Sequence, residues 1–195
     1  MAVVHDVHYP ALDVPRISFS ANWWVIIAIG ILVWAVHSPS FWFLDFVHIG
    51  SAILWTGTDI FMGFILGPIM RRLDPASRRA LYLRLVPRML FYMPTMSTLT
   101  ITAGFSLANR LGFFMLPTPR FYWVVAALAI VTIMTIQGFG ILLPTNLRVF
   151  FEMRKERADV EKVQRLMTWY IKVVASQAVM QVLIIAIMAR FRAGF

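Results

Sequence analysis

Long apolar segments constrain this chain more than any other feature of its sequence. Five of them are bounded by charged or turn-forming residues, and they lie at about residues 19–37, 41–70, 88–107, 121–143 and 170–189. A helix needs roughly 20 apolar residues to cross the hydrocarbon core of a bilayer, and a helix satisfies its own backbone hydrogen bonds there. The sequence therefore predicts an all-α integral membrane bundle of five transmembrane helices, a four-helix core plus one, in a single domain over residues 1–195.

Composition supports the same class. The chain is 60% hydrophobic and 14% charged, whereas soluble domains are about 45–50% apolar and about 25% charged. It contains no Cys, which excludes disulfides, thiolate metal sites, a Cys nucleophile and thioether-linked haem. The net charge is +9, but the basic residues lie beside apolar segments. Anionic lipid headgroups are therefore the expected partner of these residues, and nucleic acid is not.

The distribution of basic residues predicts an orientation. Fourteen of the 18 Lys and Arg residues lie in the N-terminal segment, after the second apolar segment or after the fourth. Basic residues near the ends of membrane helices concentrate on the cytoplasmic side. We expect a multi-pass protein of the inner (cytoplasmic) membrane, with its N-terminus in the cytoplasm and its C-terminus outside.

Residues 145–172 are too polar to span a membrane, yet their apolar positions recur at helical spacing. Such spacing is typical of a helix with one buried face. We predict a cytoplasmic amphipathic helix before the last span, which either lies against the membrane or extends the fifth span.

The second apolar segment holds most of the candidate functional residues. At 100° per residue, Asp45, His48, Trp55 and Asp59 fall on one stripe of a helix. Ionisable groups inside a membrane are costly and commonly mark functional sites. Because Asp45 precedes His48 by three residues, its carboxylate can accept one imidazole N–H and leave the other ring nitrogen free to bind a metal.

For each remaining candidate, its position along its helix decides whether it can reach a metal bound to His48. Asp59 lies eleven residues beyond His48, about 16 Å along a helix, so it cannot share a metal with His48 and we expect it to act in proton handling or packing. His37, at the outer end of the first segment, is either a second metal ligand or an interfacial histidine. Met180 is the next candidate ligand. His5 and His8 lie on the opposite side and should not reach the site.

Residues 46–108 carry a recognisable pattern. It comprises His-Ile-x5-Trp-x-Gly from His48 to Gly57, a Gly-Pro pair at residues 67–68, a basic loop, Arg88, and Thr102 with Gly104 in the third span. This pattern resembles copper-resistance protein D (CopD) and its small membrane relatives, and more distantly the membrane protoporphyrinogen oxidases of the HemJ type. The resemblance implies a four-helix membrane bundle that holds a b-type haem, with His48 as an axial ligand.

Three functional interpretations remain open at this point. The first is a membrane protein that binds haem b and acts in electron transport, with His48 and His37 as iron ligands and with Asp45 and Trp55 beside the cofactor. The second is a transporter for copper or a small solute, in which Asp59 carries a proton. The third is a non-catalytic accessory subunit of a respiratory complex, bound to partner subunits or to further copies of itself. The sequence identifies no catalytic residue.

Overall fold

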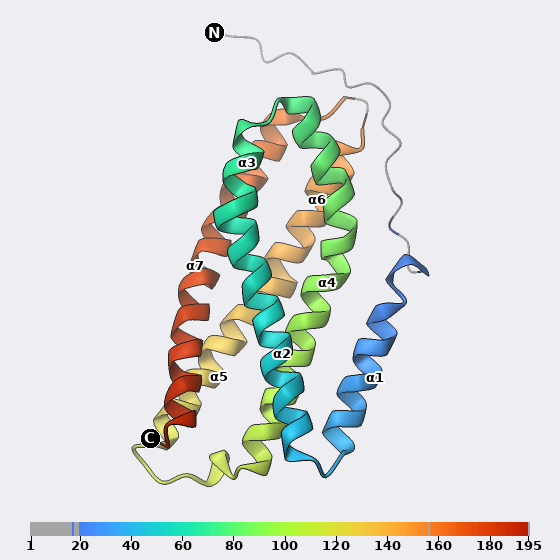
Figure 1. Ribbon diagram of the computed structural model, residues 1–195. Helices are drawn as coiled ribbons and strands as arrows, with labels where there is room; N and C mark the ends of the chain where they lie inside the picture. The colour runs from blue at the N-terminus through green and yellow to red at the C-terminus, as the bar shows by residue number, and fades with distance from the viewer. Residues whose placement is uncertain (1–16, 18–19, 156, 195) are drawn as a thin grey trace.

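The computed structural model describes residues 17, 20–155 and 157–194. Long helices run side by side and are joined by short connections (Figure 1). The helical elements of the described residues are η1 (Ser20–Asn22), α1 (Trp24–His37), α2 (Phe41–Ile60), η2 (Phe61–Leu66), α3 (Gly67–Arg72), α4 (Pro75–Arg110), η3 (Phe113–Met115), α5 (Phe121–Thr135), η4 (Ile136–Leu142), α6 (Leu143–Met153) and α7 (Val160–Arg192). The predicted all-α bundle is confirmed.

Two of the long helices are continuous across several of these elements. α2, η2 and α3 form one helix, Phe41–Arg72, and α5, η4 and α6 form another, Phe121–Met153. Each contains a π-helical segment, η2 in the first and η4 in the second. Such wide turns inside α-helices are frequent at functional sites, so the residues near η2 and η4 are candidates for a functional site.

Three helices are long and apolar enough to cross a membrane by length and composition: Phe41–Arg72, Phe121–Met153 and Val160–Arg192. The other two predicted spans differ from these for different reasons. α1 is apolar but has only 14 residues. α4 has 36 residues and carries buried hydroxyl groups such as Thr95 and Ser97 on the side that packs against α1, α2 and α6.

The surface of the bundle is apolar and part of its interior is polar. Ile26 and Phe64 are each 77% exposed, whereas Gln177 and Gln181 are 5% and 4% exposed. Water would disfavour this distribution, but a lipid environment matches apolar outer faces and allows polar side chains to bond between helices. The protein is therefore a membrane-embedded helical bundle.

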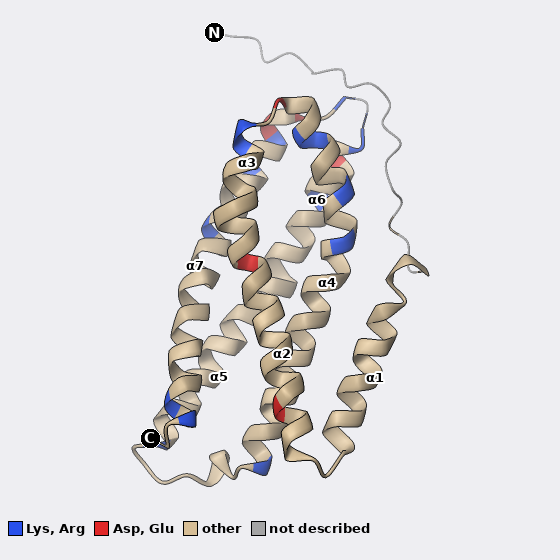
Figure 2. Cartoon of the chain, viewed as in Figure 1, with Lys and Arg blue, Asp and Glu red and all other residues tan. Residues whose placement is uncertain are grey.

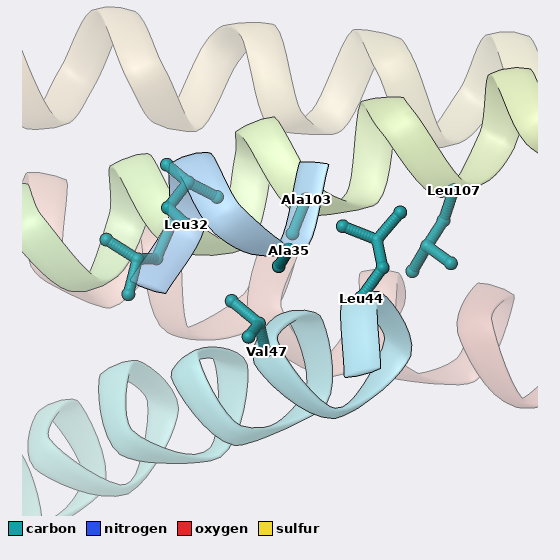
Figure 3. Packing of buried hydrophobic residues seen from close by; sticks show 7 residues of the cluster. Leu32, Ala35, Leu44, Val47, Ala103 and Leu107 are labelled. Carbon is teal, nitrogen blue, oxygen red and sulfur yellow. The ribbon is translucent and has the colours of Figure 1, made fainter. Parts of the chain in front are cut away.

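One apolar cluster joins α1, α2 and α4. Its members are Leu32, Ala35, Leu44, Val47, Leu99, Ala103 and Leu107 (Figure 3). Ala35 and Ala103 are fully buried, and small residues of this kind allow membrane helices to approach closely. α1 packs on α2 and α4 at the edge of the bundle, which agrees with a four-helix core plus one (Figure 1).

A second cluster lies at the other end of α4. Tyr82, Leu83 and Val86 pack there against Val149 and Phe150 of α6. Lys and Arg residues gather at this end of the bundle, which we call the basic end (Figure 2). Few basic residues lie at the opposite end.

The separate amphipathic helix predicted for residues 145–172 is not present. The first part of this segment continues the fourth long helix to Met153, and the rest begins α7 at Val160, so only the extension of the fifth span is correct. The break has a physical cause. Buried Arg79 donates from Nε to the carbonyl of Met153 (2.8 Å) and from Nη2 to that of Lys155 (3.1 Å), and Asp159 then caps α7 by accepting from the Lys162 amide (2.9 Å).

Candidate functional site

The His48 imidazole is held by the backbone of α4. Its Nδ1 atom lies 2.8 Å from the carbonyl oxygen of Thr100. A carbonyl oxygen only accepts hydrogen bonds, so Nδ1 carries the hydrogen and donates. The Nε2 atom of the neutral ring then keeps its lone pair, which is the form of histidine that binds metals.

Gly104, one helical turn beyond Thr100, makes room for the same ring. A Cβ atom at residue 104 would lie 2.6 Å from His48 Cε1 and 2.9 Å from Nδ1, closer than real Cβ contacts come. Any other residue would displace the imidazole. The sequence pattern that includes both His48 and Gly104 thus corresponds to a direct contact between α2 and α4.

Two hydroxyl groups fasten these helices beside the ring. The Oγ atom of buried Ser51 lies 2.9 Å from Thr100 Oγ1 and 2.7 Å from the carbonyl oxygen of Val47. Residue 100 therefore faces α2 with both its hydroxyl and its carbonyl group. The bond between the two hydroxyl groups and the bond from His48 to Thr100 fix the rotation of α4 relative to α2, and with it the position of the imidazole.

The other predicted neighbours of His48 lie in different surroundings. Asp45 is half-buried, one turn from His48. The sequence predicted that its carboxylate accepts the imidazole N–H, but His48 donates that N–H to the Thr100 carbonyl. His37 is exposed at the end of α1, where its Nδ1 atom lies 2.8 Å from the carbonyl oxygen of Val33. Trp55 is half-buried on α2, two turns from His48. His5 and His8 lie outside the described residues.

The Asp59 carboxylate bonds to a different helix. Its Oδ2 atom accepts a hydrogen bond from Nε2 of Gln181 on α7. Asp59 is half-buried and Gln181 is buried. The sequence shows Gln181 only as one of two glutamines at helical spacing, and nothing in α2 indicates that it would be the partner of Asp59.

Further polar contacts surround the π-helical segment η4. Gln177 of α7 donates to the carbonyl of Met134 (3.0 Å), and Gln137 of η4 donates to Ser176 Oγ (3.1 Å). The Gln137 Oε1 atom is buried, with no hydrogen-bond partner among the described residues. The middle of α7 is thus joined to its neighbours by amide side chains, a common way of holding helices together in lipid.

In the part of the chain that the structure describes, no three His, Asp or Glu side chains lie together as a metal-binding group. His48 and Asp59 belong to separate places on α2, as their spacing predicts. The structure therefore has two candidate sites, which we call the His48 site (His48, Ser51, Thr100 and Gly104) and the Asp59 site (Asp59 and Gln181).

Comparison with known proteins adds no assignment. No protein-family model matches this chain, and no curated protein or solved structure matches it significantly.

Proposed function

We propose that this protein is a membrane redox protein that holds a b-type haem through Nε2 of His48. The observation that carries the proposal is the hydrogen bond from His48 Nδ1 to the Thr100 carbonyl, over the backbone of Gly104. Metal-binding histidines almost always donate their second ring N–H in this way, which fixes the tautomer and raises the basicity of the ligand.

The donor set fits haem better than it fits a bare metal ion. A porphyrin provides four nitrogen ligands, so the protein needs to add only one or two axial ligands. His48 provides one such nitrogen, and among the described residues no cluster of acidic or histidine side chains surrounds it. The similarity of residues 46–108 to the CopD pattern supports the same choice.

His37 is the candidate second ligand. Like His48, it bonds a backbone carbonyl through Nδ1, which leaves its Nε2 free. It lies at the end of α1, a helix that packs on α2 and α4. Met180 of α7 is adjacent to Gln181, which bonds Asp59, and Asp59 lies about 16 Å along α2 from His48, so Met180 is too far along the bundle to bind the same iron.

Bound haem would supply one-electron transfer. The chain itself contributes the imidazole, the Thr100 carbonyl that orients it, and the apolar residues of α1, α2 and α4 that exclude water. We further propose that the basic end faces the cytoplasm, beside anionic headgroups, in an inner membrane with the N-terminus inside and the C-terminus outside.

The visible absorption spectrum of the purified protein, expressed with sufficient haem supply, tests the haem proposal. We expect a Soret band and a reduced-minus-oxidised signal that His48→Ala abolishes without preventing membrane insertion. His5→Ala and His8→Ala serve as matched controls and should retain the signal. Wild-type protein without Soret absorption would overturn the proposal and favour the transporter or accessory-subunit interpretation.

The second ligand is tested separately. His37→Ala should retain haem but change its spectrum from that of a six-coordinate to that of a five-coordinate iron. An unchanged spectrum would assign the second ligand elsewhere. A Met ligand is then distinguished from a His ligand by a higher reduction potential.

A further inference from the structure

We propose that Asp59 and Gln181 form a proton-binding site inside the membrane and that the proton reaches it from the basic end of the bundle. This inference goes beyond the haem proposal, because it uses no residue of the His48 site. The ligand is the proton itself, and the binding atom is a carboxylate oxygen of Asp59.

Because its hydrogen-bond partner is an uncharged amide, Asp59 can change its charge. The Gln181 amide donates to the carboxylate, and no ion pair to Asp59 occurs among the described residues. An amide can donate to a carboxylate or accept from a carboxylic acid, whereas Lys or Arg would hold the charged form. A carboxylate in lipid with no cationic partner gains by taking up a proton.

Few of the titratable groups that the structure describes lie near Asp59. On α4, the Tyr92 hydroxyl bonds the Leu54 carbonyl (3.2 Å) and accepts from Thr58 (3.3 Å). On α7, Tyr170 lies toward the basic end. On α2 itself, His48 and Asp45 are eleven or more residues away, about 16 Å at 1.5 Å per residue. These neighbours provide no cation that would keep Asp59 ionised.

A line of polar side chains leads from the basic end to Asp59. Tyr170, Gln177 and Gln181 are spaced by seven and four residues on α7, so they lie on one face of that helix. We call them the α7 polar row. At its start, Tyr170 accepts from Asn146 (3.2 Å), which in turn accepts from Tyr82 of α4 (3.3 Å).

A further polar side chain, Gln137 of η4, lies beside the row at mid-depth. Gln137 bonds Ser176, which is the residue next to Gln177, and its Oε1 atom has no partner in the described part of the protein. Tyr170 and Gln177 are about 10 Å apart along the axis, with Val173 and Val174 between them on the same face, and Gln177 and Gln181 are about 6 Å apart. Both separations exceed a direct hydrogen bond. Proton transfer along the row therefore proceeds through intervening water molecules, for which these amides and hydroxyls are suitable partners.

The same face of α7 is apolar on the other side of Asp59. Beyond Gln181 it carries Ile184, Ile187 and Met188, and Phe191 then packs edge-on against Phe113 with ring centroids 5.0 Å apart. Ile187 is buried. This segment, about 15 Å from Gln181 to Phe191, offers a proton no hydrogen-bonding groups and is longer than the gap between Tyr170 and Gln177, so exchange from the end opposite the basic end is disfavoured.

The chemical step is a proton transfer without any change of oxidation state. A carboxylate oxygen of Asp59 accepts a proton relayed by water along the α7 polar row and becomes a carboxylic acid, and each water that passes on a proton receives another from the side of the basic end, where bulk solvent supplies it. The acid then donates to Oε1 of Gln181 after the amide rotates. Release follows the same route in reverse.

Infrared difference spectroscopy of the full-length protein in oriented liposomes tests the site. Acidification should raise a protonated-carboxyl C=O band that Asp59→Asn abolishes, Asp59→Glu shifts and Asp45→Asn leaves unchanged. His48→Ala should also leave the band unchanged, so failure of the haem proposal and failure of this one are distinguishable. A folded Asp59→Asn protein with the same difference spectrum as wild type would overturn the site.

The route is tested by one-sided pH jumps. We expect a jump at the basic end to raise the band faster than a jump at the opposite end. Gln177→Leu should slow the response about tenfold, corresponding to the loss of about one hydrogen bond. Gln164→Leu, on the exposed surface of α7, is the matched control and should have no effect. Equal rates from both ends, or equal effects of the two Gln variants, would overturn the route.

Discussion

The imidazole of His48 lies on the backbone of Gly104, in the space that a Cβ atom would fill at 2.6 Å from Cε1. This contact joins α2 to α4 at the point where Thr100 accepts the hydrogen bond from Nδ1. The orientation of one ring thus depends on the absence of a side chain on the facing helix.

Gly104→Ala should therefore disturb the His48 site. We expect the variant to lose haem absorption and to be destabilised by about 1–3 kcal/mol, as overpacked sites are. Thermal melting in detergent and the Soret band measure the two effects. Gly50→Ala is the matched control, because a Cβ atom at residue 50 meets nothing within 4 Å. Equal behaviour of the two variants would contradict the contact.

Arg79 should be required for the connection between α6 and α7. Its guanidinium is buried and donates to the carbonyls of Met153 and Lys155. Arg79→Lys offers a single ammonium nitrogen, which cannot stand at both the Nε and the Nη2 positions, and should destabilise the protein by about 2–4 kcal/mol. Denaturant melts of the variant measure this loss. Arg78→Lys, at an exposed position, should change stability by less than about 0.5 kcal/mol, and a comparable loss there would show that the buried bonds are not the cause.

Glu152 should make stability depend on pH in the acidic range. Its ion pairs with Lys155 (2.8 Å) and Lys162 (2.6 Å) lower the pKa of the Glu152 carboxyl from 4.5 to about 2. Because this pKa is lower in the folded protein, the stabilisation is complete above about pH 4.5 and is lost as the pH falls toward 2. The Lys side chains are 57% and 42% exposed, so each pair contributes only about 0.2–1 kcal/mol.

Glu152→Gln tests this assignment. The variant should melt at a lower temperature than wild type at pH 7, and the difference should shrink as the pH falls through the interval from about 4.5 to about 2. Glu161→Gln, at an exposed position, should follow the wild-type curve. A difference that persists unchanged below this interval would assign the effect to packing rather than to charge.

The orientation of the bundle is open to direct measurement, because the natural chain contains no Cys. Single Cys residues at Ser77 and Glu161, both exposed at the basic end, should resist an impermeant thiol reagent in intact cells. A Cys at Thr118, exposed between α4 and α5, should react. The reverse labelling would refute an N-terminus in the cytoplasm.

The limits of prediction from the sequence are clearest at residues 145–172. Helical spacing correctly indicated helices there, but the break between Met153 and Val160 depends on Arg79, which lies more than 70 residues away. The sequence offers nothing to distinguish Arg79 from the other arginines of its segment. Only packing buries this one and turns its guanidinium toward the end of α6.

By itself the sequence determined the membrane class, the helical bundle and the separation of His48 from Asp59, because apolar length and residue spacing are local properties of a helix. The tertiary structure decided the partners. The imidazole N–H assigned to Asp45 is donated to Thr100, and Asp59 bonds Gln181, 122 residues away. Such pairings depend on how each helix is rotated against its neighbours. That rotation is set by contacts such as Ala35, Ala103 and Gly104 between helices, which no single segment specifies.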